Sequence, residues 1–361
     1  MKVPMADLQR LHQSIKDELE AAIEGVFGKS AFILGSETEA FETEFATYLG
    51  AKYAVGVGSG TDAIKIALMA LGISEGDEVI TTALSAYPTA EAILWTGAKP
   101  VFIDIDERTC NIDPSKVEEK ITTRTKAVLP VHLYGAPANM TKIMEIARTH
   151  KLFVIEDCCQ AHGARVSNAF VGTLGNVGCF SFYPSKNLGG IGDGGMIIAT
   201  EEEIAKKARA LRDHGRTGRD THSVLGFNSR LDGIQSAVLR VKLRHLAAHN
   251  EMRAYGTAVY KQNILTEYLD LPASIPGNAN HLFVIQVKEN RDGLQKYLRQ
   301  EGIETLVHYP IALHRQSAYK VDVALPVVER VVRKIVSLPL FPLMTAEERS
   351  HVICTVNQWK S

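Results

Sequence analysis

Short apolar segments alternate with helical stretches between residues 53 and 200, and this alternation restricts the possible folds more than any other feature. The segments are YAVGV at 53–57, EVIT at 78–81, PVFIDID at 100–106, AVLPVHL at 127–133, FVIEDC at 153–158, CFSFYP at 179–184 and GMIIAT at 195–200. Helices are expected between them at about 61–71, 88–96 and 140–150. Such alternation predicts an α/β fold with a mostly parallel central sheet covered by helices on both faces.

The pattern changes after residue 200, and the 361-residue chain is about twice as long as a typical domain. A long helix is expected from about Asp232, followed after residue 280 by a strand (HLFVIQV) and a helix (DGLQKYLRQEG). We therefore predict a large domain over residues 1–235, and a connecting helix with a smaller α+β domain over 236–361. Near the N-terminus, a surface helix is predicted by the spacing of Leu8, Leu11, Ile15 and Leu19.

The charge balance and the cysteines limit the function classes. Forty basic and 41 acidic residues leave a formal net charge of -1, which gives no reason to expect nucleic acid or a membrane as partner. No apolar run could span a bilayer, and no signal peptide is apparent. The five cysteines show no metal-ligand spacing, so we expect no metal site and a reducing, cytoplasmic location. Cys158 and Cys159 are interpreted as small packing residues.

Lys186 lies in SFYPSKNLGGIGDGG at 181–195, between a predicted strand and a glycine-rich turn. Glycines allow a backbone to approach a ligand closely. A lysine can form a Schiff base where its surroundings make the neutral amine accessible. Taken alone, a loop lysine is more often a solvated charge.

Asp157 follows Val154 and Ile155 in VIEDCCQAHG, at the carboxyl end of a predicted buried strand. A buried carboxylate is costly without a partner. A pyridinium nitrogen is one such partner, because the carboxylate keeps the ring protonated and able to accept electrons. The alternative is that Asp157 or Glu156 caps the next helix.

Glycines also lead from a strand into a helix in GVGSGTDA at 56–63, where free N–H groups and the helix dipole suit a phosphate. A second glycine run, GIGDGG at 190–195, matches a dinucleotide-binding pattern literally. That pattern requires a helix after the glycines. Here the strand-like MIIAT follows, so the dinucleotide interpretation fails.

These segments, together with NSRLDGIQSAVLRVKL, resemble the DegT/DnrJ/EryC1/StrS family of sugar aminotransferases within the fold-type I pyridoxal-phosphate enzymes. The resemblance runs from FILGSETEAFETEFA at 32–46 to SLPLFPLMT at 337–345. It implies pyridoxal 5′-phosphate as cofactor, bound to Lys186 as a Schiff base, with Asp157 at the ring nitrogen and Gln160 against the ring or its 3′-oxygen. It also implies phosphate contacts from Gly60, Thr61 and Ser181, and from Asn228 of a neighbouring subunit. The last role implies a homodimer with shared active sites.

Two segments are less well defined by the resemblance. Many family members place an aromatic residue over the cofactor, whereas SAYPTAEAI at 85–93 has Ala86 there and Tyr87 beside it. Either Tyr87 stacks on the ring after a small shift in register, or something smaller covers it. HYPIALHRQSAY at 308–319 resembles the segment that lines the sugar pocket, so His308, Tyr309 and His314 are candidate sugar contacts or structural residues.

The predicted function is transfer of an amino group from L-glutamate to a nucleotide-linked 3-keto-6-deoxy sugar, with dTDP as the expected nucleotide. Amination at C3 is favoured over C4 by the resemblance alone. A sister group dehydrates sugars and carries histidine in place of the lysine, so Lys186 argues against that activity. The sequence also leaves open a regulatory protein on the same fold and a general amino-acid aminotransferase.

Overall fold

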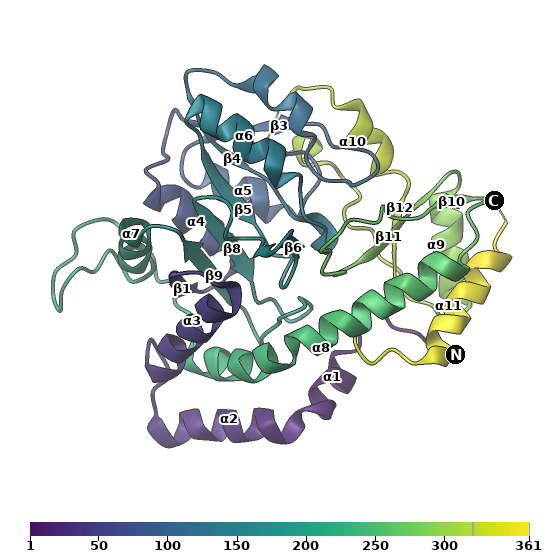
Figure 1. The fold of residues 1–361 in the computed structure, drawn as a ribbon, viewed down its shortest axis with the longest axis horizontal. Coiled ribbons are helices and arrows are strands. Elements are labelled where there is room, and N and C mark those ends of the chain that lie inside the picture. The colour runs from purple at the N-terminus through teal and green to yellow at the C-terminus, as the bar shows by residue number, and fades with distance from the viewer. Residues whose placement is uncertain (320, 361) are drawn as a thin grey trace.

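A seven-stranded sheet forms the centre of the molecule (Figure 1). The computed structural model describes residues 1–319 and 321–360. The strand order is β1-β9-β8-β5-β4-β2-β3, with strands Tyr53–Val57 (β1), Glu78–Thr82 (β2), Lys99–Ile103 (β3), Thr125–Leu129 (β4), Phe153–Asp157 (β5), Val177–Ser181 (β8) and Gly195–Ala199 (β9). Only β9 runs antiparallel to its neighbours. Each predicted apolar segment overlaps one of these strands, so the mostly parallel sheet is confirmed.

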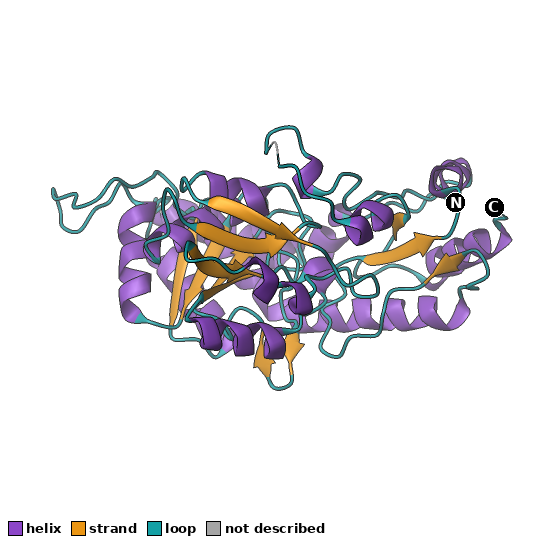
Figure 2. Ribbon diagram, turned by 90° about the horizontal axis from the view of Figure 1, so that it is seen from above, coloured by secondary structure: helices purple, strands orange, loops and turns teal. Residues whose placement is uncertain are grey.

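Helices cover both faces of this sheet (Figure 2). They are α3 (Ser36–Leu49), α4 (Gly60–Ala70), α5 (Pro88–Leu94), α6 (Met140–His150) and α7 (Glu202–Arg212). Because successive strand side chains point to opposite faces, Val55 of β1 belongs to the apolar cluster of α4 and α7, and its neighbour Ala54 to that of α3. Both faces of the strands are therefore buried, which explains their nearly continuous apolar sequences.

A 31-residue helix, α8 (Gly233–Asn263), runs from the large sheet to the second sheet (Figure 1). Asp232 is its N-cap residue, as the sequence indicates. It packs against α3, against α2 (Lys16–Lys29) and against α11 (Ala346–Gln358). Within the described residues, no helix is both long and apolar enough to cross a membrane. The predicted boundary at 235/236 falls near the start of α8, and the division into two domains there remains a prediction.

The second sheet is antiparallel and consists of β10 (Leu269–Asp270), β11 (Phe283–Val287) and β12 (Ile335–Leu338). It has its own apolar cluster, in which Phe283 and Leu338 pack with residues of α9 (Arg291–Gln300) and α11. The remaining elements are the hairpin β6 (Arg165–Val166) and β7 (Ala169–Phe170), helix α10 (Pro326–Val331), and the short 3-10 helices Pro114–Lys116, Glu118–Lys120, Leu133–Gly135 and Leu313–Arg315.

The N-terminal helix differs from the prediction. Two helices, α1 (Leu8–Ser14) and α2, are separated at Ile15, whose φ is -128°. Ile15 and Leu19 are buried against Val238 and Val241 of α8, as the spacing predicts. α1 instead turns towards the C-terminal part of the chain, where Arg10 donates to both carboxylate oxygens of Glu348. The residues predicted to share one helix face therefore belong to two helices, with Leu8 and Leu11 in α1 and Leu19 in α2.

Candidate active site

A cavity of about 600 Å³ brings together most of the predicted site residues. It lies beside the carboxyl ends of β5 and β8, the edge at which ligands bind in such sheets. Its lining includes the predicted residues Gly60, Thr61, Asp157, Gln160, Ser181, Lys186, His308 and Tyr309. Among residues 1–319 and 321–360, the lining of this cavity does not include Tyr87, Asn228 or His314.

Lys186 is half-buried in the turn between β8 and β9, where its backbone N–H donates to the carbonyl of Tyr183. Burial lowers the pKa of the Lys186 amine, although nearby Cys159 and Asp157 act in the opposite direction. Desolvation favours the neutral amine, which is the nucleophilic form of a lysine. The strand β9 follows the turn directly, as expected, so the glycines lack the helix that the dinucleotide pattern requires.

Helix α8 supports the Lys186 turn from outside the cavity. Asn250 accepts a hydrogen bond of 2.9 Å from the amide of Asn187, next to the lysine. Gln235 accepts from the backbone N–H of Ile191 at 2.9 Å, and the buried amine of Lys242 donates to the carbonyl of Gly189 at 2.7 Å. Contacts on both sides of the turn therefore fix it to a rigid helix.

Asp157 ends β5 and is 3% exposed. One carboxylate oxygen accepts from the hydroxyl of Thr89 at 2.8 Å, and the other from the backbone N–H of Cys159 at 3.1 Å. Ser85 lies 2.7 Å from the Thr89 hydroxyl and extends this network. In the described part of the chain, no α-helix follows β5 before α7, so the helix-cap alternative is wrong for Asp157. The carboxylate is held in a fixed orientation at the cavity wall.

Glu156, the neighbour of Asp157, has a structural role. Its two oxygens accept from the backbone N–H groups of Gly172, Leu174 and Gly175, and Oε2 lies 3.0 Å from Nε2 of His132. The other nitrogen of His132 accepts from a backbone N–H, so Nε2 carries the proton and donates to Glu156. One side-chain atom each of His132, Glu156 and Cys158 lie within 4.8 Å of one another, a spacing at which they could hold a metal ion. The carboxylate of Glu156 and both ring nitrogens of His132 are, however, already hydrogen-bonded within the protein.

The N-terminus of α4 forms another part of the cavity wall. Ser59 is the N-cap residue and accepts from the backbone N–H of Asp62. Gly60 and Thr61 begin the helix, so their backbone N–H groups lie at its positive end. A Cβ at Gly60 would lie 2.5 Å from Cβ of Ser181 and 3.0 Å from the sulfur of Cys159. The close packing here therefore requires glycine at position 60.

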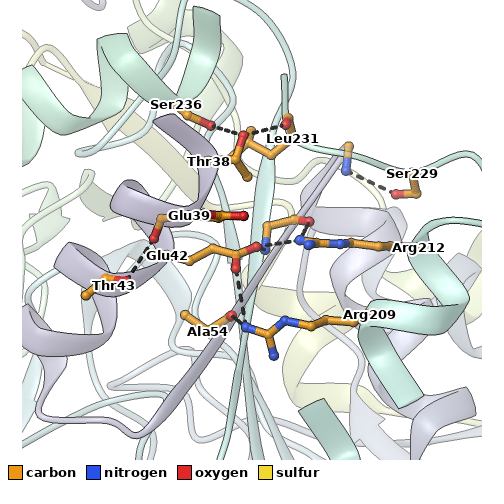
Figure 3. A network of polar contacts seen from close by, with 12 residues as sticks. Thr38, Glu39, Glu42, Thr43, Ala54, Arg209, Arg212, Ser229, Leu231 and Ser236 are labelled. Carbon is orange, nitrogen blue, oxygen red and sulfur yellow. Dashed lines mark hydrogen bonds and ion pairs between the residues drawn. The ribbon is translucent and has the colours of Figure 1, made fainter. Parts of the chain in front are cut away.

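A buried ion-pair network supports the strand that leads to this helix (Figure 3). Glu42 of α3 accepts from the backbone N–H of Gly56 at 2.8 Å and from Arg212 of α7. Arg212 also donates to the carbonyl of Gly56 at 2.7 Å, and Arg209 to that of Ala54 at 2.8 Å. β1 is thus fixed between two helices immediately before the glycine-rich turn.

Gln160 is oriented by hydrogen bonds at both ends of its amide. Its oxygen accepts from the backbone N–H of Tyr134 at 2.8 Å, and its nitrogen lies 2.9 Å from the hydroxyl of Tyr309. Burial raises the pKa of Tyr309. His308, next to it, is bonded to Ser337 at 2.8 Å, and burial lowers its pKa to about 4. His308 is therefore neutral near pH 7.

Two of the three predicted residues outside the cavity, Tyr87 and His314, contact other side chains. Tyr87 stacks on Tyr319 with ring centroids 5.2 Å apart, whereas its neighbours Ala86 and Pro88 line the cavity. His314 is buried and lies 2.9 Å from the carboxylate of Glu329, so we carry only His308 and Tyr309 forward as sugar-contact candidates.

Asn228 is exposed in the loop between α7 and α8. The following residue, Ser229, fixes this end of the loop. Its hydroxyl accepts from the backbone N–H of Gly58 at 3.0 Å and donates to Asp62 at 2.8 Å. The end of the loop that carries Asn228 therefore lies beside the glycine-rich turn.

Several lining residues were not found by sequence reasoning: Met5, Ala6, Thr89, Tyr183, Asp193, Arg253, His281 and Glu304. Cys159 is also different from its expected packing role. It is only half-buried and lines the cavity, whereas Cys158 is buried as predicted. Thr89, Tyr183 and Asp193 lie in two segments that the sequence analysis singles out, at 85–93 and 181–195. No local motif marks the others, because tertiary packing brings them to the cavity. The position of Cys159, two residues after Asp157 at the same strand end, is the signal available for it.

The chain has the α/β fold of the pyridoxal-phosphate aminotransferases, with the cavity at the carboxyl ends of the strands of its central sheet. The chain belongs to the DegT/DnrJ/EryC1/StrS aminotransferase family, whose model matches residues 13–357. It is an aminotransferase of that family. The predicted family and fold class are thereby confirmed.

Two relatives match almost end to end. The chain is 44% identical to a pleiotropic regulatory protein of Geobacillus stearothermophilus, over 98% of this chain and 97% of the relative. It is 40% identical to the dTDP-3-amino-3,4,6-trideoxy-alpha-D-glucose transaminase of Streptomyces venezuelae, over 99% and 96%.

Solved structures show the same fold. DesV of S. venezuelae, in complex with a ketimine intermediate, superposes with a TM-score of 0.96 at 41% identity, over 99% of this chain and 98% of that one. NtdA of Bacillus subtilis with bound cofactor PMP has a TM-score of 0.94 at 34% identity, over 98% and 84%.

Proposed function

We propose that this protein transfers an amino group from L-glutamate to C3 of a dTDP-linked 3-keto-6-deoxy sugar, with pyridoxal 5′-phosphate as its cofactor. The observation that carries the proposal is the convergence of Lys186, Asp157 and the N-terminus of α4 on one cavity. The names of the relatives support the substrate class, since one makes a dTDP-3-amino sugar.

The residues around the cavity fit this cofactor. Lys186 offers a primary amine of lowered pKa, and Asp157 is a buried carboxylate oriented by two donors. Gly60 and Thr61 provide the positive end of α4 for a phosphate, with the Ser181 hydroxyl beside them. When bound, the cofactor supplies an electron sink for bond changes at the carbon that carries the nitrogen.

Each residue has a defined task in this proposal. Nζ of Lys186 removes the proton from the amine-bearing carbon of glutamate and later delivers a proton to the carbon that was the sugar ketone. The Asp157 carboxylate holds a proton on the ring nitrogen. Gln160, fixed through Tyr134 and Tyr309, lies against the ring.

We assign sugar recognition to His308 and Tyr309, because both line the cavity. The neutral imidazole and the phenol can both donate and accept hydrogen bonds, as sugar hydroxyls require. Transfer to C4 and sugar dehydration are the competing reactions within the family. Transfer to C4 would need a sugar whose ketone is at C4 instead of C3, and dehydration would remove water without transferring nitrogen.

We further propose a homodimer in which Asn228 contacts the cofactor phosphate of the neighbouring subunit. Two observations support this role. Asn228 is exposed on the loop between α7 and α8, and its neighbour Ser229 ties that loop to the glycine-rich turn at Gly58.

A regulatory role is the second candidate, because one relative is named a pleiotropic regulatory protein. A protein with only this role would retain the cavity but would not exchange nitrogen with glutamate. Lys186 and Asp157 both line the cavity, which favours catalysis.

A spectroscopic experiment tests the proposal. L-glutamate added to the cofactor-loaded protein should abolish the visible absorption band as the amino group is transferred, and 2-oxoglutarate should restore it. Lys186→Ala should lose both the visible band and turnover, because no other amine in the motif replaces it. A Lys186→Ala protein with full transaminase activity would contradict the proposal.

A further inference from the structure

Arg253 of α8 is a buried cation in the cavity wall with no acidic partner among the described residues. Its side chain is 6% exposed, and no carboxylate of residues 1–319 or 321–360 forms a salt bridge with it. A buried charge is costly unless an ion or a set of hydrogen bonds compensates it. Burial lowers the pKa of Arg253 to about 10, which leaves the guanidinium charged at neutral pH.

The guanidinium is fixed at one corner and has spare donors elsewhere. Its Nη1 donates to the carbonyl of His281 at 3.1 Å and to that of Leu340 at 2.8 Å. Nε is buried without a partner, and Nη2 makes no hydrogen bond within the described part of the chain. Unlike Nε, Nη2 is not fully enclosed by protein atoms, and Arg253 lines the cavity. An arginine held in this way is prepared to bind an oxyanion.

A short chain of contacts links Arg253 to the reacting end of the cavity. Its partner His281 donates through Nδ1 to the side-chain oxygen of Asn187 at 2.9 Å, and Asn187 directly follows Lys186. His281 also lines the cavity, and burial, followed by the charges of Lys186 and Arg253, lowers its pKa. The guanidinium is therefore close to the place where the donor carbon must meet the lysine.

We propose that Arg253 binds a carboxylate of the amino-acid donor, L-glutamate. This inference rests on the proposed function and extends it to the donor subsite. The diphosphate of a sugar nucleotide is the other oxyanion that the enzyme meets. It is separated from the reacting C3 by the sugar ring, and the nucleoside beyond it needs the mouth of the cavity. A donor carboxylate is directly attached to the reacting carbon or three bonds away.

Single-turnover kinetics distinguish binding of the donor carboxylate from binding of the diphosphate. L-glutamate and the dTDP-amino sugar, the latter in the reverse direction, both react with the same cofactor-loaded form of the protein, so their half-maximal concentrations can be compared directly. For Arg253→Gln, the glutamate concentration that gives half-maximal rate should rise about tenfold or more, whereas the dTDP-amino sugar should change less than about twofold. Arg253→Lys should recover part of the glutamate affinity. Arg244→Gln serves as the matched control on α8, since Arg244 is exposed and pairs with Glu18.

Binding without chemistry provides a second readout. Calorimetric titration with glutarate, which has both carboxylates but no amine, should show weaker binding to Arg253→Gln, and titration with dTDP should not. Weaker dTDP binding with unchanged glutarate binding would assign Arg253 to the diphosphate and overturn the proposal. Unchanged binding of glutarate and dTDP would show that Arg253 has only a structural role. An equal loss of glutarate and dTDP binding, together with an altered cofactor spectrum, would lead to the same conclusion. Failure of the proposed function is distinguishable, because the unmodified protein would then not respond spectrally to glutamate at all.

Discussion

Asp157 and Lys186 acquire their chemical properties from the groups that surround them. Thr89 and the Cys159 backbone direct both oxygens of Asp157, and burial lowers the pKa of Lys186. Neither side chain is unusual as a residue type. The strand end that holds the carboxylate and the turn that holds the amine bring them to one cavity, where we propose that they act together.

Substitution of Asp157 by asparagine tests the role of the charge. The side chain keeps its shape, so the cofactor should remain bound, but the ring nitrogen loses the partner that keeps it protonated. A hydrogen bond to a charged group contributes about 1.5–3 kcal/mol, so kcat should fall roughly 10- to 150-fold with little change in KM. Steady-state kinetics and cofactor content measure both effects. A kcat near that of the unmodified protein would assign another role to this carboxylate.

Thr89→Val is the matched variant for the same network. It removes one donor to Asp157 but keeps the negative charge, so its kcat should lie between those of Asp157→Asn and the unmodified protein. A larger loss for Thr89→Val than for Asp157→Asn would show that the valine disturbs the site itself.

At the scale of elements, the sequence predicts best what is local. Apolar runs identify all seven strands of the central sheet, because burial on both faces leaves few polar positions. The break at Ile15 could not be predicted, since it depends on α1 turning towards Glu348, more than 300 residues away. The same reason hides Thr89 and Arg253, whose cavity positions depend on tertiary packing. The stacking of Tyr87 on Tyr319 likewise joins segments far apart in the chain.

The start of α4 allows a sharp test at this scale. In Gly60→Ala the new Cβ would meet Ser181 at 2.5 Å, so the helix must shift from its position beside the cavity. Overpacking of this kind costs about 1–3 kcal/mol, and we expect roughly 5- to 150-fold weaker binding of pyridoxal 5′-phosphate. Gly25→Ala is the control, because a Cβ at Gly25 of α2 has no neighbour within 4 Å. That change should stabilise the protein by up to about 1 kcal/mol. Equal cofactor affinity in both variants would contradict the account.

At the scale of the whole molecule, the proposed role of Asn228 makes a complete site a property of two subunits. Lys186→Ala and Asn228→Asp should each be inactive, the second because a carboxylate near the cofactor phosphate adds like-charge repulsion. In a mixed dimer one site collects both lesions and the other has neither.

Activity after unfolding and refolding the two variants together tests this arrangement. Random pairing makes half of the dimers mixed, each with one intact site, so activity should recover to about a quarter of the unmodified level. Each variant refolded alone is the control. Absence of recovery, with mixed dimers verified by mass, would exclude Asn228 from the site of the neighbouring subunit.

The most direct test of the central claim follows the nitrogen itself. The protein loaded with pyridoxal 5′-phosphate would be incubated with 15N-labelled L-glutamate and dTDP-3-keto-6-deoxyglucose, and the product analysed by mass spectrometry and NMR. We predict a dTDP-amino sugar that contains the label and shows 15N coupling at C3. A parallel incubation with the 4-keto isomer tests the alternatives. Label at C4 or loss of water without label, together with an unchanged 3-keto sugar, would contradict C3 amination, and no reaction of either sugar would contradict the enzymatic role.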